Sequence, residues 1–242
     1  PLVANKTLGF NIDDRRELAP DPRRLYANLK RVAVEWQRDP MPDSAIADRF
    51  ATVPQMLCIV NSRAHAHALH GMIHHLPGAR HLTTLMCAAH RRQVLAAIRE
   101  DLAARRPVRL VATSLIEAGV DVDFPEVWRA AAGLDSIAQA AGRCNREGRL
   151  EGGLGRVVVF EPVDHGVPRA LKTFWEAARP VLDRHTEVLG LDAVRDYFRQ
   201  LYFLKGPVAL DRATLDGRDF AIIEAIAKAS AQGATMMDYP FA

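Results

Sequence analysis

The chain has 242 residues, a net charge of +3 and a pI of about 9.0. Apolar residues make up 49% and charged residues 25%, which excludes a disordered chain and fits one large folded domain with or without an appendage. The basic balance favours an anionic partner such as a nucleic acid or a nucleotide. Three cysteines without CxxC spacing argue against a disulfide framework and a structural zinc centre, so we expect a reducing cytoplasm.

The first 54 residues are expected to form a lead-in region. The opening residues PLVANKTLGF carry neither a signal peptide nor an initiator Met, which suggests a piece of a longer polypeptide. No apolar run is long enough to cross a membrane, so we expect no membrane partner. Residues 1–20 lack periodicity and predict a linker, followed by a polar helix over 22–38 and a short helix over 44–50. We therefore expect residues 1–54 to form a lead-in linker with helices.

Strand and helix patterns alternate after Pro54. The predicted strands are 56–61, 81–86, 108–114, 126–132 and 156–162, and the predicted helices between them are 62–76, 89–106 and 135–146. This alternation is typical of βαβ units and predicts an α/β fold, a parallel sheet with helices on both faces over residues 55–163. Residues 164–242 predict a helical C-terminal accessory region, with helices at 168–185, 191–204 and 218–231 and no further strand.

Residues 139–148, QAAGRCNREG, combine two arginines, a glutamine and two glycines; we call them the arginine segment. If the helix continues to Arg146, then Gln139, Arg143 and Arg146 are spaced i, i+4 and i+7 and lie on one face. Two guanidinium groups one turn apart can bind phosphate oxygens, and an amide beside them can orient water. The alternative is a pair of surface arginines in ion pairs.

Residues 111–125, VATSLIEAGVDVDFP, follow a predicted strand; we call them the loop segment. Thr113 and Ser114 stand at the carboxyl end of that strand, where hydroxyl and amide groups can hold an anion. Gly119 permits a tight turn, and Asp121 can accept hydrogen bonds from sugar hydroxyls. Turn formation alone also explains such a sequence.

Together the two segments carry a resemblance. ATSLIEAGVDVDFP followed by GLDSIAQAAGRCNREG resembles motifs V and VI of superfamily 2 helicases, and is most similar to the CRISPR-associated helicase–nuclease of type I interference systems. LCIVNSR (57–63) resembles motif IV of that family. The resemblance covers roughly residues 50–210 and implies the second RecA-like domain, followed by the start of the C-terminal region.

The resemblance implies roles for ten residues, and position in the chain adds Arg91. Arg146 resembles the arginine finger, Arg143 its companion on the γ-phosphate, and Gln139 the residue near the attacking water. Gly119 and Asp121 resemble positions that face the nucleotide. The residues implied in contacts to the nucleic-acid backbone are Thr113, Ser114, Asn61, Ser62 and Arg63, and Arg91 joins them because it stands close to a strand end.

The sequence contains no GxxxxGK[ST] phosphate loop, no DExH or DExD run and no His-Asp dipeptide. The resemblance therefore implies that ATP with Mg²⁺ is held by a first RecA-like domain absent here, in the same polypeptide as an HD nuclease domain. Its further implied partners are single-stranded DNA, travelled 3′ to 5′, and an RNA-guided surveillance complex. We expect the chain alone to hydrolyse no ATP.

Two other functions fit the residues. One is a superfamily 2 helicase of repair or RNA metabolism, and the other is a non-catalytic α/β module that binds a nucleotide or a partner. The histidines of the predicted helix 62–76 include His67, His70 and His74 on one face. No carboxylate or cysteine accompanies them in that helix, so we expect a solvated histidine-rich helix and no metal site.

Overall fold

The computed structural model describes residues 18–117, 119–150, 153–215 and 218–224. One compact unit ends at Tyr197, and the chain from Phe198 onward belongs to a second unit. The predicted linker lies almost wholly outside the described residues. Among the described helices, none combines the length and apolarity that crossing a bilayer requires.

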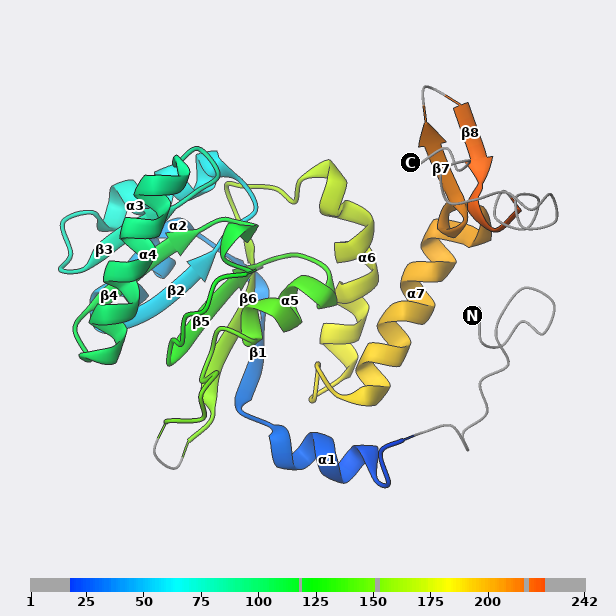
Figure 1. Ribbon diagram of the computed structural model, residues 1–242, viewed down its shortest axis with the longest axis horizontal. Helices are drawn as coiled ribbons and strands as arrows, with labels where there is room; N and C mark the ends of the chain where they lie inside the picture. Colours follow the sequence, from blue (N-terminus) through cyan, green and yellow to red (C-terminus); the bar gives the residue numbers. More distant parts are fainter. Residues whose placement is uncertain (1–17, 118, 151–152, 216–217, 225–242) are drawn as a thin grey trace. The chain divides into compact units, whose positions relative to one another are not determined.

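A six-stranded sheet forms the centre of the first unit (Figure 1). Its spatial order is β1 (Val32–Met41), β6 (Gly155–Pro162), β5 (Glu126–Ala130), β2 (Gln55–Ile59), β4 (Val108–Ala112) and β3 (Ala79–Leu82). Every pair of neighbouring strands is parallel. The predicted α/β class with a RecA-like parallel sheet is confirmed.

Successive residues of a strand point to opposite faces of the sheet. Both faces of this sheet carry apolar side chains, and helices cover both. Leu57 and Ile59 of β2 face a core shared with α4 (Ala88–Ala103) and α5 (Leu134–Ala141). Met56 and Cys58 face a second core with α2 (Asp43–Thr52) and α3 (Arg63–Ile73). Each fully buried aliphatic side chain stabilises the fold by roughly 1.5–3 kcal/mol. Two cores therefore fix the sheet from both sides.

The predicted helix over 22–38 is present only as far as Leu29, and the prediction is wrong from there on. Asp21 caps a short helix, α1 (Pro22–Leu29), by accepting a hydrogen bond from the backbone N–H of Arg24 at 3.0 Å. The chain then enters β1, which pairs in parallel with β6. The β-branched and aromatic residues of VAVEW suit a strand, and tertiary pairing overrides the polar helical pattern. The lead-in region therefore completes the sheet, and position 54 is no boundary between units.

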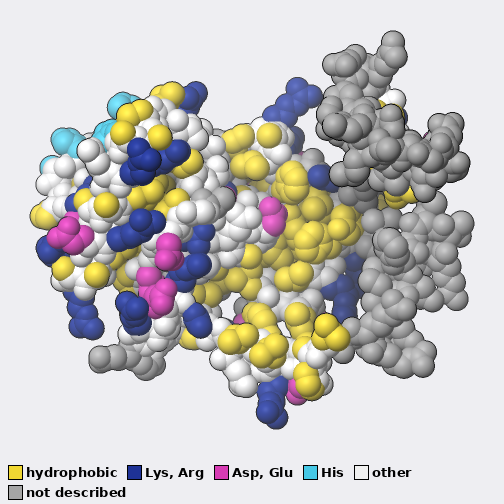
Figure 2. All heavy atoms as spheres, viewed as in Figure 1, with side chains coloured by type: hydrophobic (Ala, Val, Ile, Leu, Met, Phe, Trp, Pro, Cys, Tyr) yellow, Lys and Arg dark blue, Asp and Glu magenta, His cyan; other side chains and the backbone are white. Residues whose placement is uncertain are grey.

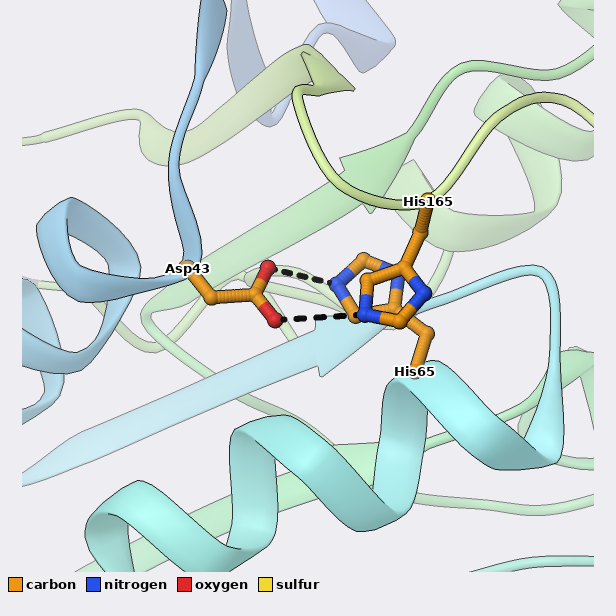
Figure 3. A group of neighbouring side chains, drawn as sticks. All are labelled: Asp43, His65 and His165. Carbon is orange, nitrogen blue, oxygen red and sulfur yellow. Dashed lines mark hydrogen bonds and ion pairs between the residues drawn. The ribbon is translucent and has the colours of Figure 1, made fainter.

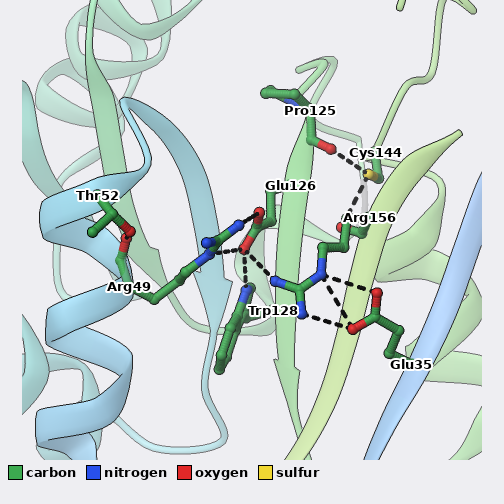
Figure 4. Close-up of polar contacts among 8 residues, drawn as sticks. All are labelled: Glu35, Arg49, Thr52, Pro125, Glu126, Trp128, Cys144 and Arg156. Carbon is green, nitrogen blue, oxygen red and sulfur yellow. Dashed lines mark hydrogen bonds and ion pairs between the residues drawn. The ribbon is translucent and has the colours of Figure 1, made fainter. Parts of the chain in front are cut away.

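A charged network holds the amino ends of the strands (Figure 4). The Glu126 carboxylate accepts two hydrogen bonds from Arg49, at 2.8 and 2.6 Å, and one from the indole N–H of Trp128 at 2.7 Å. Arg156 donates to the same carboxylate at 3.2 Å and pairs with Glu35 of β1. The pKa of Glu126 is lowered: burial raises it, and the hydrogen bonds of Arg49 and Trp128 more than offset that effect. This network ties α2, β5, β6 and β1 together.

The helical appendage begins within the first unit. The chain forms α6 (Arg169–Arg184) and then α7 (Leu191–Leu210), so the predicted helices at 168–185 and 191–204 are present. Trp175 of α6 meets Trp36 of β1 edge to face, with ring centroids 5.3 Å apart.

In the second unit, β7 (Arg212–Leu215) pairs antiparallel with β8 (Arg218–Ala221). The predicted helix at 218–231 is therefore wrong at its start, and its residues from 225 lie outside the described chain. The expectation of a purely helical region is also wrong, because a hairpin stands where no strand was predicted.

Candidate functional site

The loop segment leaves the carboxyl end of β4 and forms a single 3₁₀ turn, Ser114–Ile116. Thr113 is buried, and its hydroxyl is enclosed without a hydrogen-bond partner. Ser114 is exposed at the rim of the sheet. Of the two hydroxyls predicted to contact a nucleic acid, the structure thus offers that of Ser114 to solvent and encloses that of Thr113.

The residues predicted as a second contact region follow β2 on the same rim. The Asn61 amide donates to the carbonyl of Ala131 at 2.6 Å, which ties the end of β2 to the end of β5. Ser62 caps α3 by accepting from the backbone N–H of His65 at 3.1 Å. Arg63 is exposed, and Arg91 is half-buried in the first turn of α4. The side chains of Asn61 and Ser62 therefore serve the fold, while the two arginines face outward.

The arginine segment does not continue the helix, which corrects the prediction that three side chains share one helical face. Helix α5 ends at Ala141 with Gly142 as its cap, and Asn145 adopts a left-handed backbone at φ 45°. Cys144 instead forms a parallel bridge with Phe124, just before β5. The backbone N–H of Phe124 donates to the carbonyl of Arg143, and that of Asn145 donates to the carbonyl of Phe124, each at 2.9 Å. Pairing with the sheet outcompetes another helical turn.

Arg143 is buried and turned onto the loop segment. Its guanidinium donates to the carbonyls of Ile116 at 2.9 Å and Glu117 at 2.6 Å, with a longer bond to Gly142 at 3.4 Å. Burial and the charge of Arg146 lower the pKa of Arg143. In this conformation Arg143 clamps the 3₁₀ turn and is not half of an open phosphate fork.

Arg146 is exposed and lies beside the loop segment. Its Nε atom is 2.8 Å from Oδ1 of Asp121 in an ion pair whose side chains are 44% and 69% exposed. The Asp123 carboxylate accepts from the backbone N–H groups of Arg146 at 2.7 Å and Glu147 at 3.2 Å, which fixes the turn. Gln139 is also exposed, on α5. The structure therefore brings Arg146 together with Asp121, and both remain accessible.

Two grooves flank this turn. One, of about 820 Å³, is lined by Asp121, Asp123 and the arginines Arg99, Arg105 and Arg149. The other, of about 530 Å³, is lined by Arg146 and Gly142 together with residues of α1 and 186–189. Both lie toward the amino ends of the strands, because α5 carries the chain back across the sheet from the rim where Ser114 lies. The predicted nucleotide-facing and nucleic-acid-facing residues are thus at opposite edges.

A buried polar chain links the two edges, and sequence reasoning missed its central members. Arg129 is 1% exposed, and its Nε atom is 2.7 Å from Oε1 of Glu117; the alignment is that of an ion pair and not of a hydrogen bond. Arg129 also donates to Oδ1 of Asn61 at 2.6 Å. Glu117 in turn accepts from Arg143 through its backbone carbonyl. An arginine inside the apolar strand pattern EVWRAAA was the available signal, since a buried charge requires a partner.

The surface has no single basic face in the view of Figure 2. Lysine and arginine side chains lie singly or in small groups among acidic ones over the first unit. The face seen in this view therefore carries no broad positive surface.

Comparison with known proteins shows similarity to one family. Residues 49–149 match the family model described as CRISPR-associated nuclease/helicase Cas3, C-terminal. A curated relative, the CRISPR-associated nuclease/helicase Cas3 of Haloferax volcanii, is 50% identical over 58 residues, which are 24% of this chain and 6% of the relative.

Solved structures agree in fold. Cas3 of T. fusca crystallised with ATP is 18% identical over 90% of this chain and 27% of that chain, with a TM-score of 0.59. A chain in a pre-nicking CRISPR RNA-guided surveillance complex is 18% identical over 78% of this chain and 29% of its own length, with a TM-score of 0.54. This chain spans less than a third of these neighbours.

The fold is that of a RecA-like domain. Within it, residues 49–149 are similar to the C-terminal part of CRISPR-associated nuclease/helicase Cas3. The resemblance identified from the loop and arginine segments is confirmed at this level.

Proposed function

We propose that this chain is the second RecA-like half of an ATP-driven translocase on single-stranded DNA that serves CRISPR type I interference. The observation that carries the proposal is the exposed Arg146, paired with Asp121 beside a groove, inside the region that matches the Cas3 C-terminal model. The nucleotide would lie between this half and a first RecA-like domain of the same polypeptide.

Arg146 is suited to act as the arginine finger. Its ion pair with Asp121 is exposed, and such pairs contribute about 0–1 kcal/mol, so a γ-phosphate can replace the carboxylate at little cost. An arginine finger accelerates phosphoryl transfer by roughly 10³–10⁵-fold because it stabilises charge developing on the phosphate oxygens. Asp121 and Gly119 would then face the nucleotide, and Gln139 would help to orient the attacking water.

Arg143 takes a different part from the one that the resemblance implies. To reach a phosphate it would have to leave three carbonyl oxygens of the loop segment and α5. We assign it the positioning of the loop segment in this conformation, with contact to the γ-phosphate restricted to a closed state. Its substitution should therefore disturb both the loop and ATP turnover.

The opposite edge is proposed to contact the DNA backbone. Ser114 and Arg63 are exposed, and Arg91, Asn61 and Ser62 are half-buried. Thr113 is buried, and the side chains of Asn61 and Ser62 are already engaged in hydrogen bonds with the backbone. Contacts by cations to phosphates release counterions, so binding should weaken as salt increases.

The remaining parts of the machine are proposed to belong to other domains of the polypeptide. On the nucleotide side of the described chain, Asp123 is occupied by two backbone N–H groups and Asp121 by Arg146. These residues therefore do not form a magnesium cage, and Mg²⁺ would be held with the phosphate loop by the first RecA-like domain. The HD nuclease domain and the RNA-guided surveillance complex complete the proposed partners, in the cytoplasm.

The decisive experiment compares Arg146→Ala with Arg149→Ala in the full-length protein, by measuring DNA-stimulated ATP hydrolysis. Arg149 is a matched control because it lies in the same turn and is more exposed. We expect Arg146→Ala to lower kcat by at least about 10³-fold while nucleotide binding is kept, and Arg149→Ala to change it little. Equal activity of both variants would overturn the proposal and favour a non-catalytic module.

Two further assays separate the remaining alternatives. The 242-residue chain alone should hydrolyse no ATP, and turnover by a clean preparation would contradict the division of the site between two domains. Target degradation by the full-length protein should require a surveillance complex loaded with guide RNA. ATP-driven unwinding that ignores that complex would instead indicate a helicase of repair or RNA metabolism.

A further inference from the structure

Three side chains outside the proposed nucleotide and DNA sites meet at the carboxyl rim of the sheet: Asp43, His65 and His165 (Figure 3). Asp43 opens α2 directly after β1, His65 lies in the first turn of α3 after β2, and His165 follows β6. Because all the strands are parallel, the residues that follow them emerge at the same edge. Segments up to 122 positions apart thus contribute to one cluster, counting from Asp43 to His165.

Both histidines direct the same ring nitrogen at one carboxylate. Nε2 of His65 is 2.8 Å from Oδ1 of Asp43, and Nε2 of His165 is 3.6 Å from Oδ2. The two rings stack with centroids 4.1 Å apart and planes 15° apart. Figure 3 shows the carboxylate facing the edges of both rings. One ligand atom from each of the three residues thus lies within 4.8 Å of the others. Because the rings are stacked, one ring would have to rotate for both Nε2 lone pairs to point at the same ion.

The cluster is largely withdrawn from water. The side chains of His65, Asp43 and His165 are 1%, 11% and 26% exposed. The hydrogen bond from the His65 backbone to the Ser62 hydroxyl fixes the start of α3 and with it the position of this histidine. In the structure Nε2 of His65 is hydrogen-bonded to Asp43, and a bound metal ion would take the place of the proton in that contact.

We propose that Asp43, His65 and His165 bind a divalent transition-metal ion of the Zn²⁺ class, with a fourth position open to water on the His165 side. In a tetrahedral site with bonds of about 2.0–2.1 Å, ligand atoms lie about 3.3 Å apart. The nitrogen–oxygen distances are close to that value, at 2.8 Å from His65 to Oδ1 and 3.6 Å from His165 to Oδ2 of Asp43. Two imidazoles with one carboxylate favour Zn²⁺ or Co²⁺ over Mg²⁺ or Ca²⁺.

The other histidines of α3 provide the contrast. His67 is exposed, and His70 meets only another imidazole, that of His81, with centroids 4.7 Å apart. Within the described residues, the Asp43 cluster alone brings three metal-ligating side chains together. The sequence pattern led to the expectation of no metal, because the carboxylate and the second histidine come from distant segments.

The test uses the 242-residue chain freed of metal with a chelator and titrated with Co²⁺. We expect one equivalent to bind with the visible absorption of a tetrahedral site. His165→Asn and His65→Asn should each weaken binding at least about 100-fold, since even the outer partners of metal ligands contribute 10–100-fold. The control His67→Asn, on the same helix, should bind as the parent does.

Thermal unfolding provides a second readout with Zn²⁺. At a concentration 100 times Kd, the ion should raise the Tm of the parent and of His67→Asn by about 5–10 °C, and that of His165→Asn by far less. His165 lies in a partly exposed loop, so its variant keeps the test valid if His65→Asn fails to fold. Absence of binding by the parent, or undiminished binding by a folded His165→Asn variant, would overturn the proposal.

Discussion

The buried pair of Glu117 and Arg129 provides the sharpest test of how this domain is held together. Their side chains are 6% and 1% exposed. Burial is the largest influence on both groups, and it raises the pKa of Glu117 and lowers that of Arg129. Two unit charges about 4 Å apart attract by about 4 kcal/mol at an effective dielectric constant of 20, so this attraction offsets only part of the desolvation.

Removing one partner should therefore be costly, whereas removing both should not. We expect Glu117→Leu to lower the free energy of unfolding by about 3–5 kcal/mol, because it leaves the Arg129 cation buried without a counter-ion. Glu117→Leu combined with Arg129→Met should remain within about 1 kcal/mol of the parent. With an m-value of about 2 kcal/mol per M, the single variant lowers the urea midpoint by about 1.5–2.5 M.

Circular dichroism of the 242-residue chain in urea measures these midpoints. A single variant within about 1 kcal/mol of the parent would mean that water reaches Arg129 and that the pair is not enclosed. A double variant less stable than the parent by clearly more than about 1 kcal/mol would mean that the pair contributes net stability. Either result would refute the reasoning.

Three further predictions concern the fold. Gly78→Ala should destabilise the chain by several kcal/mol, because φ is +74° and a Cβ atom would lie 2.0 Å from the carbonyl oxygen of Pro107, whereas Gly71→Ala in α3 should stabilise it by about 0.5–1 kcal/mol; urea unfolding of both variants checks this. Burial and neighbouring histidines lower the pKa of His70 below 6.5, so the unfolded chain binds more protons and stability should decrease as the pH falls below 6.5. Between about pH 7.5 and 5 the free energy of unfolding should decrease less for His70→Asn than for the parent. An equal decrease would show that His70 does not cause the pH dependence. Trp36→Ala should reduce stability by up to about 3 kcal/mol, because Trp36 packs against Trp175 and donates to Asp183 at 2.9 Å, and an unchanged Tm would show that β1 contributes little.

The sheet was predictable because its strands are buried on both faces. The runs around Leu57 and Leu110 are largely apolar, and helical segments alternate with them, as expected for a parallel sheet covered on both faces. β1 was not predictable in the same way. It lies at the edge of the sheet, and its exposed charged residues gave it the composition of a polar helix. Only its pairing with β6 decides its structure.

The candidate site was also predictable only in part. Residue types and spacing identified the loop and arginine segments, and Arg146 with Asp121 is indeed together and exposed. The sequence pattern could not predict the orientation of the Arg143 side chain, because that orientation depends on where α5 ends. That end is set by the bridge between Phe124 and Cys144, two residues that carry no chemical signal of their own. Nor does local sequence reveal the meeting of Asp43 with His165.

The chain of contacts from Asn61 through Arg129 and Glu117 to Arg143 leaves the loop segment little independence. Arg143 holds the backbone of the loop segment at Glu117, and the Glu117 side chain pairs with Arg129. Because Arg129 also binds Asn61 at the end of β2, the loop segment cannot shift without disturbing that end of the strand. Cutting that connection at Arg129 should therefore release the loop segment from the end of β2.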